Sequence, residues 1–163
     1  MTPQEFKKRL DKIAAKYPDF AAQIAPLIAG RIAVSVFKRN FQTESFNGVK
    51  WLEVQRRTEG TKAYKAAERR HPARNSRKIL TGDTADLGRS IEVKEAASGR
   101  AVVWTSPRAF SGREPYGQVH NDGLRAGRGS GFIMPRRQFM GHTEELNDQV
   151  VKALEQQMAK IFK

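Results

Sequence analysis

Cysteine is absent from this chain of 163 residues. Its absence excludes disulfide bridges, thiolate nucleophiles and zinc sites built on cysteine. It leaves the redox compartment open, because a chain without cysteine tolerates oxidising and reducing surroundings alike. The fold must therefore rest on packing and hydrogen bonding.

Acidic residues are scarce relative to basic ones. The sequence contains 17 Asp and Glu against 30 Lys and Arg, which gives a net charge of +13. Such a surface attracts acidic partners, and these include nucleic acid, an acidic protein surface and an anionic membrane. Charge alone does not choose among the three.

Long uninterrupted hydrophobic runs are also missing. The most apolar stretch, 20–37, is interrupted by Gln23, Pro26, Gly30, Arg31 and Ser35. We therefore expect no segment to approach the ~20 apolar residues of a membrane-spanning helix. Residues 1–17 are amphipathic and lack the apolar core and cleavage site of a signal peptide. These patterns predict a soluble protein that has no membrane partner.

The first forty residues predict two helices. Residues 2–5 form a capping-box sequence with proline at the first helical position, and apolar residues then recur at helical spacing. A second helix begins at Asp19, with a kink expected at Pro26. Residues 32–36 alternate like a strand, but no turn signal flanks them, so we favour continuation of the helix.

Strands are predicted further along the chain. Residues 91–94 and 101–105 have strand-like composition on either side of a turn at Ser98-Gly99, and 132–134 forms a third strand. Asn47-Gly48 marks an earlier tight turn. We therefore expect a sheet of three or more strands.

The C-terminal segment predicts a long amphipathic helix. Thr143 is placed to cap it, acidic residues occupy its first turn and lysines its last, as the helix dipole favours. Taken together, the patterns predict one α+β domain over residues 1–163. It has N-terminal helices, a small antiparallel β-sheet and a long C-terminal helix packed on the sheet.

Residues 55–78 combine many cations with little apolar surface. The lysines and arginines of this segment are Arg56, Arg57, Lys62, Lys65, Arg69, Arg70, Arg74, Arg77 and Lys78. Burial of Tyr64 alone cannot offset the entropy of ordering the segment, so we expect a mobile basic loop or a frayed, locally helical arm. It contacts either DNA phosphates or an acidic neighbouring subunit. The second is favoured, because aromatic platforms for single-stranded nucleic acid are missing.

A second candidate surface lies just before the final helix. Its residues are Arg136, Arg137, Phe139 and Met140. Arginine beside aromatic and methionine side chains is typical of protein interfaces. We therefore expect a subunit or tail interface here, and DNA contact by the two arginines is the less favoured alternative.

Motifs for catalysis or for metal binding are not found in the sequence. His71, His120 and His142 lie in three separate segments and none belongs to a two-ligand spacing. The glycine-rich stretch 123–131 lacks the Gly-Lys-Ser/Thr ending of a phosphate-binding loop. We therefore expect no metal, no cofactor and no enzymatic activity.

Four short blocks follow one another along the chain. They are Asn40-Phe41 through Phe46-x-Gly48-x-x-Trp51-x-x-Val54; Ile79-Leu80-Thr81 with Leu87-x-x-Ser90-Ile91; Tyr116-Gly117-x-Val119-His120-x-x-Gly123; and Pro135-x-Arg137-x-Phe139-x-Gly141. In this order, and followed by a final helix, they resemble the phage virion morphogenesis family over about residues 20–160. Its members are also called tail completion proteins of long-tailed phages and of Mu-like prophages.

The resemblance implies a non-enzymatic α+β protein that acts in tail completion or head–tail joining as a ring of identical subunits. Its implied partners are tail tube, terminator or head–tail connector proteins. Its implied location is the host bacterial cytoplasm during assembly and then the tail or neck of the virion. The competing interpretation is a DNA-binding accessory protein that uses residues 55–78 as a non-specific arm.

Overall fold

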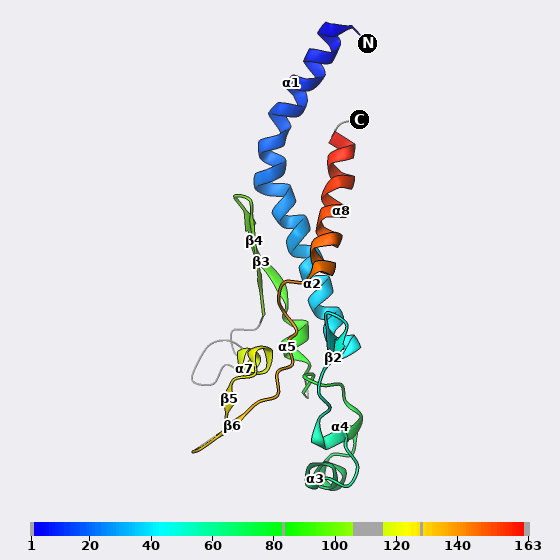
Figure 1. Cartoon of the computed structure of the whole chain (residues 1–163), viewed down its shortest axis with the longest axis vertical. Helices are drawn as coiled ribbons and strands as arrows, with labels where there is room; N and C mark the ends of the chain where they lie inside the picture. Colours follow the sequence, from blue (N-terminus) through cyan, green and yellow to red (C-terminus); the bar gives the residue numbers. More distant parts are fainter. Residues whose placement is uncertain (1, 83, 106–115, 128, 162–163) are drawn as a thin grey trace. The chain divides into compact units, whose positions relative to one another are not determined.

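The computed structural model describes residues 2–82, 84–105, 116–127 and 129–161. Long helices lie towards both ends of the chain and small antiparallel hairpins lie between them (Figure 1), which confirms the predicted α+β class. The chain forms two compact units, which are described separately. Unit 1 comprises Met1–Ser35, Glu92–Trp104 and His142–Lys163, and unit 2 comprises Val36–Ile91 and Thr105–Gly141.

Unit 1 begins with a helical segment in three parts: α1 (Pro3–Asp19), one π-helical stretch η1 (Phe20–Ile24) and α2 (Ala25–Thr43), whose residues from Val36 onward belong to unit 2. The predicted capping box is confirmed. The Thr2 hydroxyl accepts from the Glu5 amide at 3.2 Å, and the Glu5 carboxylate accepts from the Thr2 amide at 2.7 Å. Residues 32–36 are helical, as favoured.

Pro26 shapes the junction between η1 and α2. Proline has no N–H, so the carbonyl of Ala22, four residues earlier, loses its α-helical partner. The Ala25 amide bonds instead to the Phe20 carbonyl, which is the wider π-helical pattern. The freed Ala22 carbonyl accepts from the Gly99 amide at 3.1 Å. The proline therefore creates an attachment point for a hairpin.

That hairpin consists of β3 (Glu92–Ala97) and β4 (Arg100–Trp104). Ser98 and Gly99 both have positive φ angles, 52° and 74°, as a two-residue type I′ turn requires. The predicted turn is confirmed. Its strands pass so close to α2 that a Cβ added at Gly30 would lie 2.9 Å from a methyl group of Val93.

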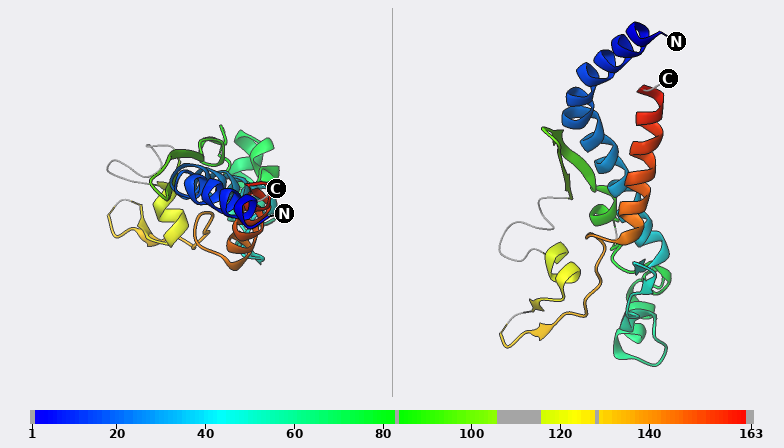
Figure 2. Two further views of the ribbon diagram at one scale, coloured as in Figure 1. Left: turned by 90° about the horizontal axis from the view of Figure 1, so that it is seen from above. Right: turned by 45° about the horizontal axis from the view of Figure 1, so that its top comes forward.

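The last element of unit 1 is α8 (Glu144–Ile161), which lies alongside the N-terminal helical segment (Figures 1 and 2). The Thr143 hydroxyl accepts from the Leu146 amide at 3.1 Å, so the predicted cap is confirmed. Leu146 and Val150 line a groove of about 450 Å³ together with Ala101 and Val103 of β4. No described side chain of α8 is fully buried.

The length and hydropathy of the N-terminal helix bear on the prediction that no segment approaches a membrane-spanning helix. By length and composition alone, the helix Pro3–Thr43 could cross a membrane, because one 18-residue window within it has a mean hydropathy of 1.6. This corrects our expectation that no segment reaches that level. A third of the window, 33%, is buried inside the protein, and core helices of soluble proteins pass the same test.

Unit 2 is built from short elements around the C-terminal half of α2. In chain order they are β1 (Ser45–Phe46), β2 (Val49–Lys50), η2 (Gln55–Arg57), α3 (Lys62–Arg70), α4 (Ala73–Ser76), α5 (Asp86–Arg89), α7 (Tyr116–Asp122), β5 (Arg125–Ala126) and β6 (Phe132–Ile133). Its core contains the aromatic and aliphatic side chains of Phe37, Phe41, Trp51, Ile79, Leu87, Ile91 and Phe139. The predicted turn at Asn47-Gly48 connects β1 to β2.

The predicted sheet of three or more strands is not what forms. Among the described residues, β1 pairs with β2, β3 with β4, and β5 with β6, each as a separate two-stranded hairpin. The strand predicted at 132–134 pairs with Arg125–Ala126, its neighbour across the glycine-rich turn. The residue pattern marks a strand correctly but carries no information about which strand it pairs with.

The basic segment 55–78 is also more regular than expected. It contains η2, α3 and α4, and the Thr61 hydroxyl caps α3 by accepting from the Tyr64 amide at 3.1 Å. Of the two forms we predicted, the helical arm therefore fits and the structureless loop does not. Hydrogen bonds to backbone carbonyls, described below, hold the segment where apolar burial is insufficient.

Candidate functional site

The four residues predicted to form an interface, Arg136, Arg137, Phe139 and Met140, lie in the segment 135–141, which runs through the core of unit 2. Phe139 is completely buried, with 0% of its surface exposed. Its ring centroid lies 5.0 Å from that of Phe41, and Phe41 meets Trp51 edge-on at 5.7 Å. These distances are those of favourable aromatic pairs, so Phe139 is one member of a three-ring cluster.

Polar side chains satisfy the backbone around Phe139. The amide group of Asn40 donates to the Phe139 carbonyl at 3.0 Å, and the Trp51 indole donates to the Gln138 carbonyl at 2.8 Å. The side-chain oxygen of Asn121 accepts from two successive amides, those of Phe139 at 3.0 Å and Met140 at 3.1 Å. Buried backbone groups need such partners, and here they come from distant parts of unit 2.

Arg137 is buried together with Phe139. Only 5% of its surface is exposed, its backbone amide donates to the His120 carbonyl at 2.7 Å, and its Nε donates to the Leu52 carbonyl at 3.0 Å. Burial lowers the pKa of Arg137 from its ordinary value, and the nearby charge of Arg56 lowers it further. Arg137 therefore links its own segment to two others in unit 2, to His120 through its backbone and to Leu52 through its side chain.

These positions correct the predicted interface. We expected Phe139 and Arg137 to present an apolar anchor and a guanidinium to a neighbouring subunit, but both are enclosed within unit 2. Composition misled because large apolar residues and arginine also suit a core whose backbone supplies acceptors. Arg136 is exposed and donates to the Gln138 side chain at 2.6 Å, and Met140 is half-buried.

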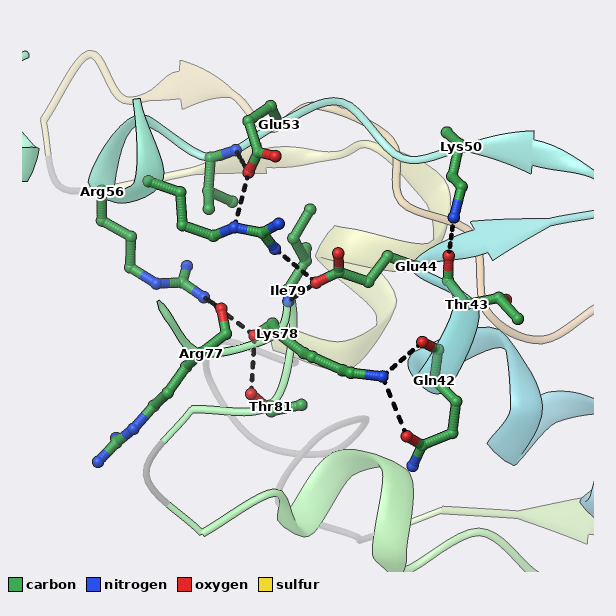
Figure 3. Close-up of polar contacts among 12 residues, drawn as sticks. Gln42, Thr43, Glu44, Lys50, Glu53, Arg56, Arg77, Lys78, Ile79 and Thr81 are labelled. Atoms are coloured by element: carbon green, nitrogen blue, oxygen red, sulfur yellow. Dashed lines mark hydrogen bonds and ion pairs between the residues drawn. The ribbon is translucent and has the colours of Figure 1, made fainter. Parts of the chain in front are cut away.

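The basic segment divides into two groups of cations, and the first is committed to internal bonds. Arg56 donates to three backbone carbonyls, those of Arg74, Arg77 and Lys78, each at 3.0 Å. Figure 3 draws the bonds to Arg77 and Lys78. The Lys78 ammonium donates to the carbonyl of Gln42 at 2.6 Å. The Arg56 bonds join the two ends of the segment, and the Lys78 bond fastens it to the end of α2.

Glu44 is the acidic centre of the same network. Its carboxylate accepts from Arg57 at 2.6 Å and from the Ile79 amide at 2.5 Å. The bond between Glu44 and Ile79 can be followed in Figure 3. Burial alone would raise the pKa of Glu44, but the Ile79 and Arg57 hydrogen bonds outweigh it and hold the pKa below its ordinary value. No sequence pattern indicates this role, because Glu44 follows a helix end in a polar stretch.

The second group of cations faces the solvent. Its members are Lys62, Lys65, Arg69, Arg70 and Arg74, all exposed on α3 and α4. Arg77 is half-buried and donates to the Gly82 carbonyl at 3.3 Å. The nine cations of the predicted arm therefore do not act alike, since some hold the fold and others present charge.

A cavity of about 340 Å³ lies between these cations and the interior segment 135–141. Its lining residues are Val54, Arg56, Arg74, Arg77, Ile79, Leu80, Gly82, His120 and Arg137. The Nδ1 atom of His120 is buried and has no hydrogen-bond partner among the described residues. Burial lowers the pKa of His120 from its ordinary value, and the charge of Arg137 lowers it further, so the surroundings favour the neutral imidazole.

Metal binding has no support in this geometry. The described residues contain no group of three or more His, Asp or Glu side chains that could hold an ion.

No protein-family model, curated protein or solved structure matches the chain. The case for a function therefore rests on the residues themselves.

The buried position of Phe139 leads to a stability prediction. We expect Phe139→Ala to lower the free energy of unfolding by about 3–5 kcal/mol, because it removes one of the three rings of the aromatic cluster and leaves a cavity beside Phe41. Phe132→Ala is the matched control: Phe132 is 56% exposed, so the change should stay within about 0.5 kcal/mol. Urea denaturation of both variants measures the difference, and equal effects would show that Phe139 is not in the core.

Proposed function

We propose that this chain is a non-enzymatic structural protein of phage virion assembly, which acts in tail completion or head–tail joining as a ring of identical subunits. The observation that carries the proposal is the convergence of the four sequence blocks in unit 2. Each block resembles the virion morphogenesis family, and each contributes to one hydrogen-bonded core. The proposed location is the host cytoplasm during assembly and then the virion.

The convergence can be followed bond by bond. The first block supplies Asn40 and Trp51, whose side chains donate to the backbone of the fourth block. The third block supplies the His120 carbonyl, which accepts from the Arg137 amide of the fourth. The second block adds Ile79 to the same core. These block residues therefore serve packing and backbone hydrogen bonding, as is expected of motifs that maintain a fold.

Exposed apolar side chains support the assembly part of the proposal. In α1, Phe6, Leu10 and Tyr17 are all exposed, and the helix buries none of its side chains. Contiguous apolar surface of this kind marks interaction sites in soluble proteins. A head-to-tail contact between identical subunits would cover such a surface and close into a ring where the rotation allows.

Arg136 remains an interface candidate. It lines a groove of about 280 Å³ on unit 2 together with Phe46, Val49 and Gln138, and Val49 is 72% exposed. An arginine beside apolar side chains is a composition enriched in subunit contacts. In the proposed ring this groove receives the neighbouring copy. Half-buried Met140 supports it through its carbonyl, which accepts from the Gln138 side chain at 3.2 Å.

The ring proposal predicts concentration-dependent association that depends on this groove. The wild-type protein should form one oligomer of defined size. Arg136→Glu should weaken association about tenfold or more, because it places the opposite charge at the contact. Lys62→Glu makes the same charge change on α3 and should leave association unchanged.

Size-exclusion chromatography with light scattering, over a concentration series, measures all three proteins. The ring is contradicted by a wild-type protein that stays monomeric up to about 1 mM, a concentration at which even weak specific contacts are populated. Equal weakening by both variants would contradict the assignment of the groove.

A second function, non-specific DNA binding, is favoured by one observation. Lys62, Lys65, Arg69 and Arg70 are exposed on α3, one short helix that carries no other basic residue. Cations arranged along a helix can neutralise several phosphates and release their counterions, which gives affinity without sequence preference. In this alternative, α3 is the contact element and not the whole segment 55–78.

Salt dependence tests the DNA alternative. We expect binding to a random-sequence duplex, titrated at about 50 mM and about 200 mM salt, to weaken steeply with salt. The double change Lys65→Gln and Arg69→Gln should lower the slope of log affinity against log salt by about two. The control changes Lys7→Gln and Lys8→Gln, on exposed positions of α1, should leave it unchanged. Identical slopes in all three proteins would rule out α3 as the contact.

A further inference from the structure

The arginine-lined cavity of unit 2 has walls from four segments. Arg56 comes from η2, Arg74 from α4, and His120 from α7, while Arg137 comes from the interior segment 135–141. These segments are distant in the sequence, and the fold brings their cationic side chains together around one cavity. At about 340 Å³ the cavity is roughly ten times the ~30 Å³ that one water occupies in the liquid, so it has room for a polyatomic ion.

The charge of this cavity is one-sided. Four arginines line it, and no acidic side chain does so among the described residues. The carboxylates that act on Arg56 are Glu44 and Glu53, and both are paired with Arg57, at 2.6 Å and 3.3 Å. They reduce the local charge without occupying the cavity. Arg56 and Arg137 lie close enough for the charge of Arg56 to lower the pKa of Arg137, so an anion between these two would be attracted by both.

Two of the arginines are held in place before any anion arrives. Arg56 is fixed by bonds to three carbonyls, and these use its Nε and one terminal nitrogen. Arg137 uses Nε for the Leu52 carbonyl, and its terminal nitrogens make no hydrogen bond among the described residues. Donors fixed in this way bind an anion without losing much side-chain entropy.

His120 adds a third, independent indication. Its Nδ1 is buried and has no hydrogen-bond partner among the described residues, which costs stability. A neutral imidazole carries one N–H that can donate to an acceptor oxygen. An oxyanion in the cavity would accept from the terminal nitrogens of Arg137 and lie beside the His120 ring.

We propose that this cavity is an oxyanion site that binds a phosphate group. A phosphate presents three or more acceptor oxygens in different directions, and this suits guanidinium groups that arrive from η2, α4 and segment 135–141. A carboxylate presents two oxygens in one plane and would engage one arginine fork. The phosphate is either free inorganic phosphate or a phosphodiester of nucleic acid. The site is independent of the assembly proposal.

Calorimetric titration with inorganic phosphate, at constant ionic strength set with chloride, tests the site in the full-length protein. The double variant Arg74→Gln and Arg77→Gln changes two lining residues, and Arg69→Gln with Arg70→Gln is the control of equal charge outside the cavity. We expect phosphate affinity to fall about tenfold or more in the first and to change less than about twofold in the second. No binding to the wild type, or equal losses in both variants, would overturn the proposal.

A measurement on the wild-type protein does not depend on whether the variants fold. In the wild-type protein, phosphate should shift the NMR signals of the His120 ring, while His71 and His142, which do not line the cavity, stay unchanged. Equal shifts at all three histidines would indicate general charge screening and would also overturn the site. His120→Gln keeps a hydrogen-bonding side chain and should weaken phosphate binding several-fold.

Competition identifies the source of the phosphate. If a short duplex DNA releases bound inorganic phosphate, the occupant is a backbone phosphodiester. If both bind without competition, the occupant is free phosphate, and either result supports the site. Glutarate at the same ionic strength is the third arm. Binding of glutarate without binding of phosphate would overturn the proposal in favour of a carboxylate site.

Discussion

Burial of Phe139 removes the backbone groups around it from water, and each of them has to find a partner inside unit 2. The side chain of Asn121 accepts from two of these amides, and Asn40 and Trp51 donate to the neighbouring carbonyls. An unpartnered group would cost about 1–3 kcal/mol, so these bonds fix the path of the segment as firmly as the aromatic packing does. The other elements of unit 2 are arranged around this constraint.

In unit 1, by contrast, few of the described apolar side chains are buried. Its helices carry apolar stripes, yet α1 and α8 bury none of their described side chains, and Phe20 and Ala33 are its main buried apolar residues. A unit that leaves its apolar surface open gains stability when a partner covers that surface. This contrast between a satisfied core and an open helical surface is why we propose an assembly protein.

Local features were predictable from the sequence, because their causes are local. The capping box at Thr2, the turn at Ser98-Gly99 and the cap at Thr143 each depend on residues within four positions of one another. The prediction that Arg137 and Phe139 form an interface was wrong, because their burial depends on distant residues. Whether Arg137 is buried depends on the Leu52 carbonyl, 85 positions away in the chain, and no local pattern reports that partner.

The basic segment shows the same limit. Its composition predicted little order, since it offers few apolar groups, but Arg56 orders it through carbonyls of residues 18 to 22 positions away. The cavity that combines this segment with His120 and Arg137 could not be foreseen, because its parts become neighbours only after unit 2 folds. The sequence shows where the lysines and arginines lie along the chain, and the fold decides which of them face one another.

Hydrogen exchange of the backbone amides tests the central claim most directly, namely that segment 135–141 is the interior support of unit 2. The amides of Arg137, Phe139 and Met140, which donate to His120 and Asn121, should exchange only when unit 2 unfolds and should be among its slowest. Exchange as fast as at exposed Ile133 in β6 would contradict the account, because it would place the segment at the surface.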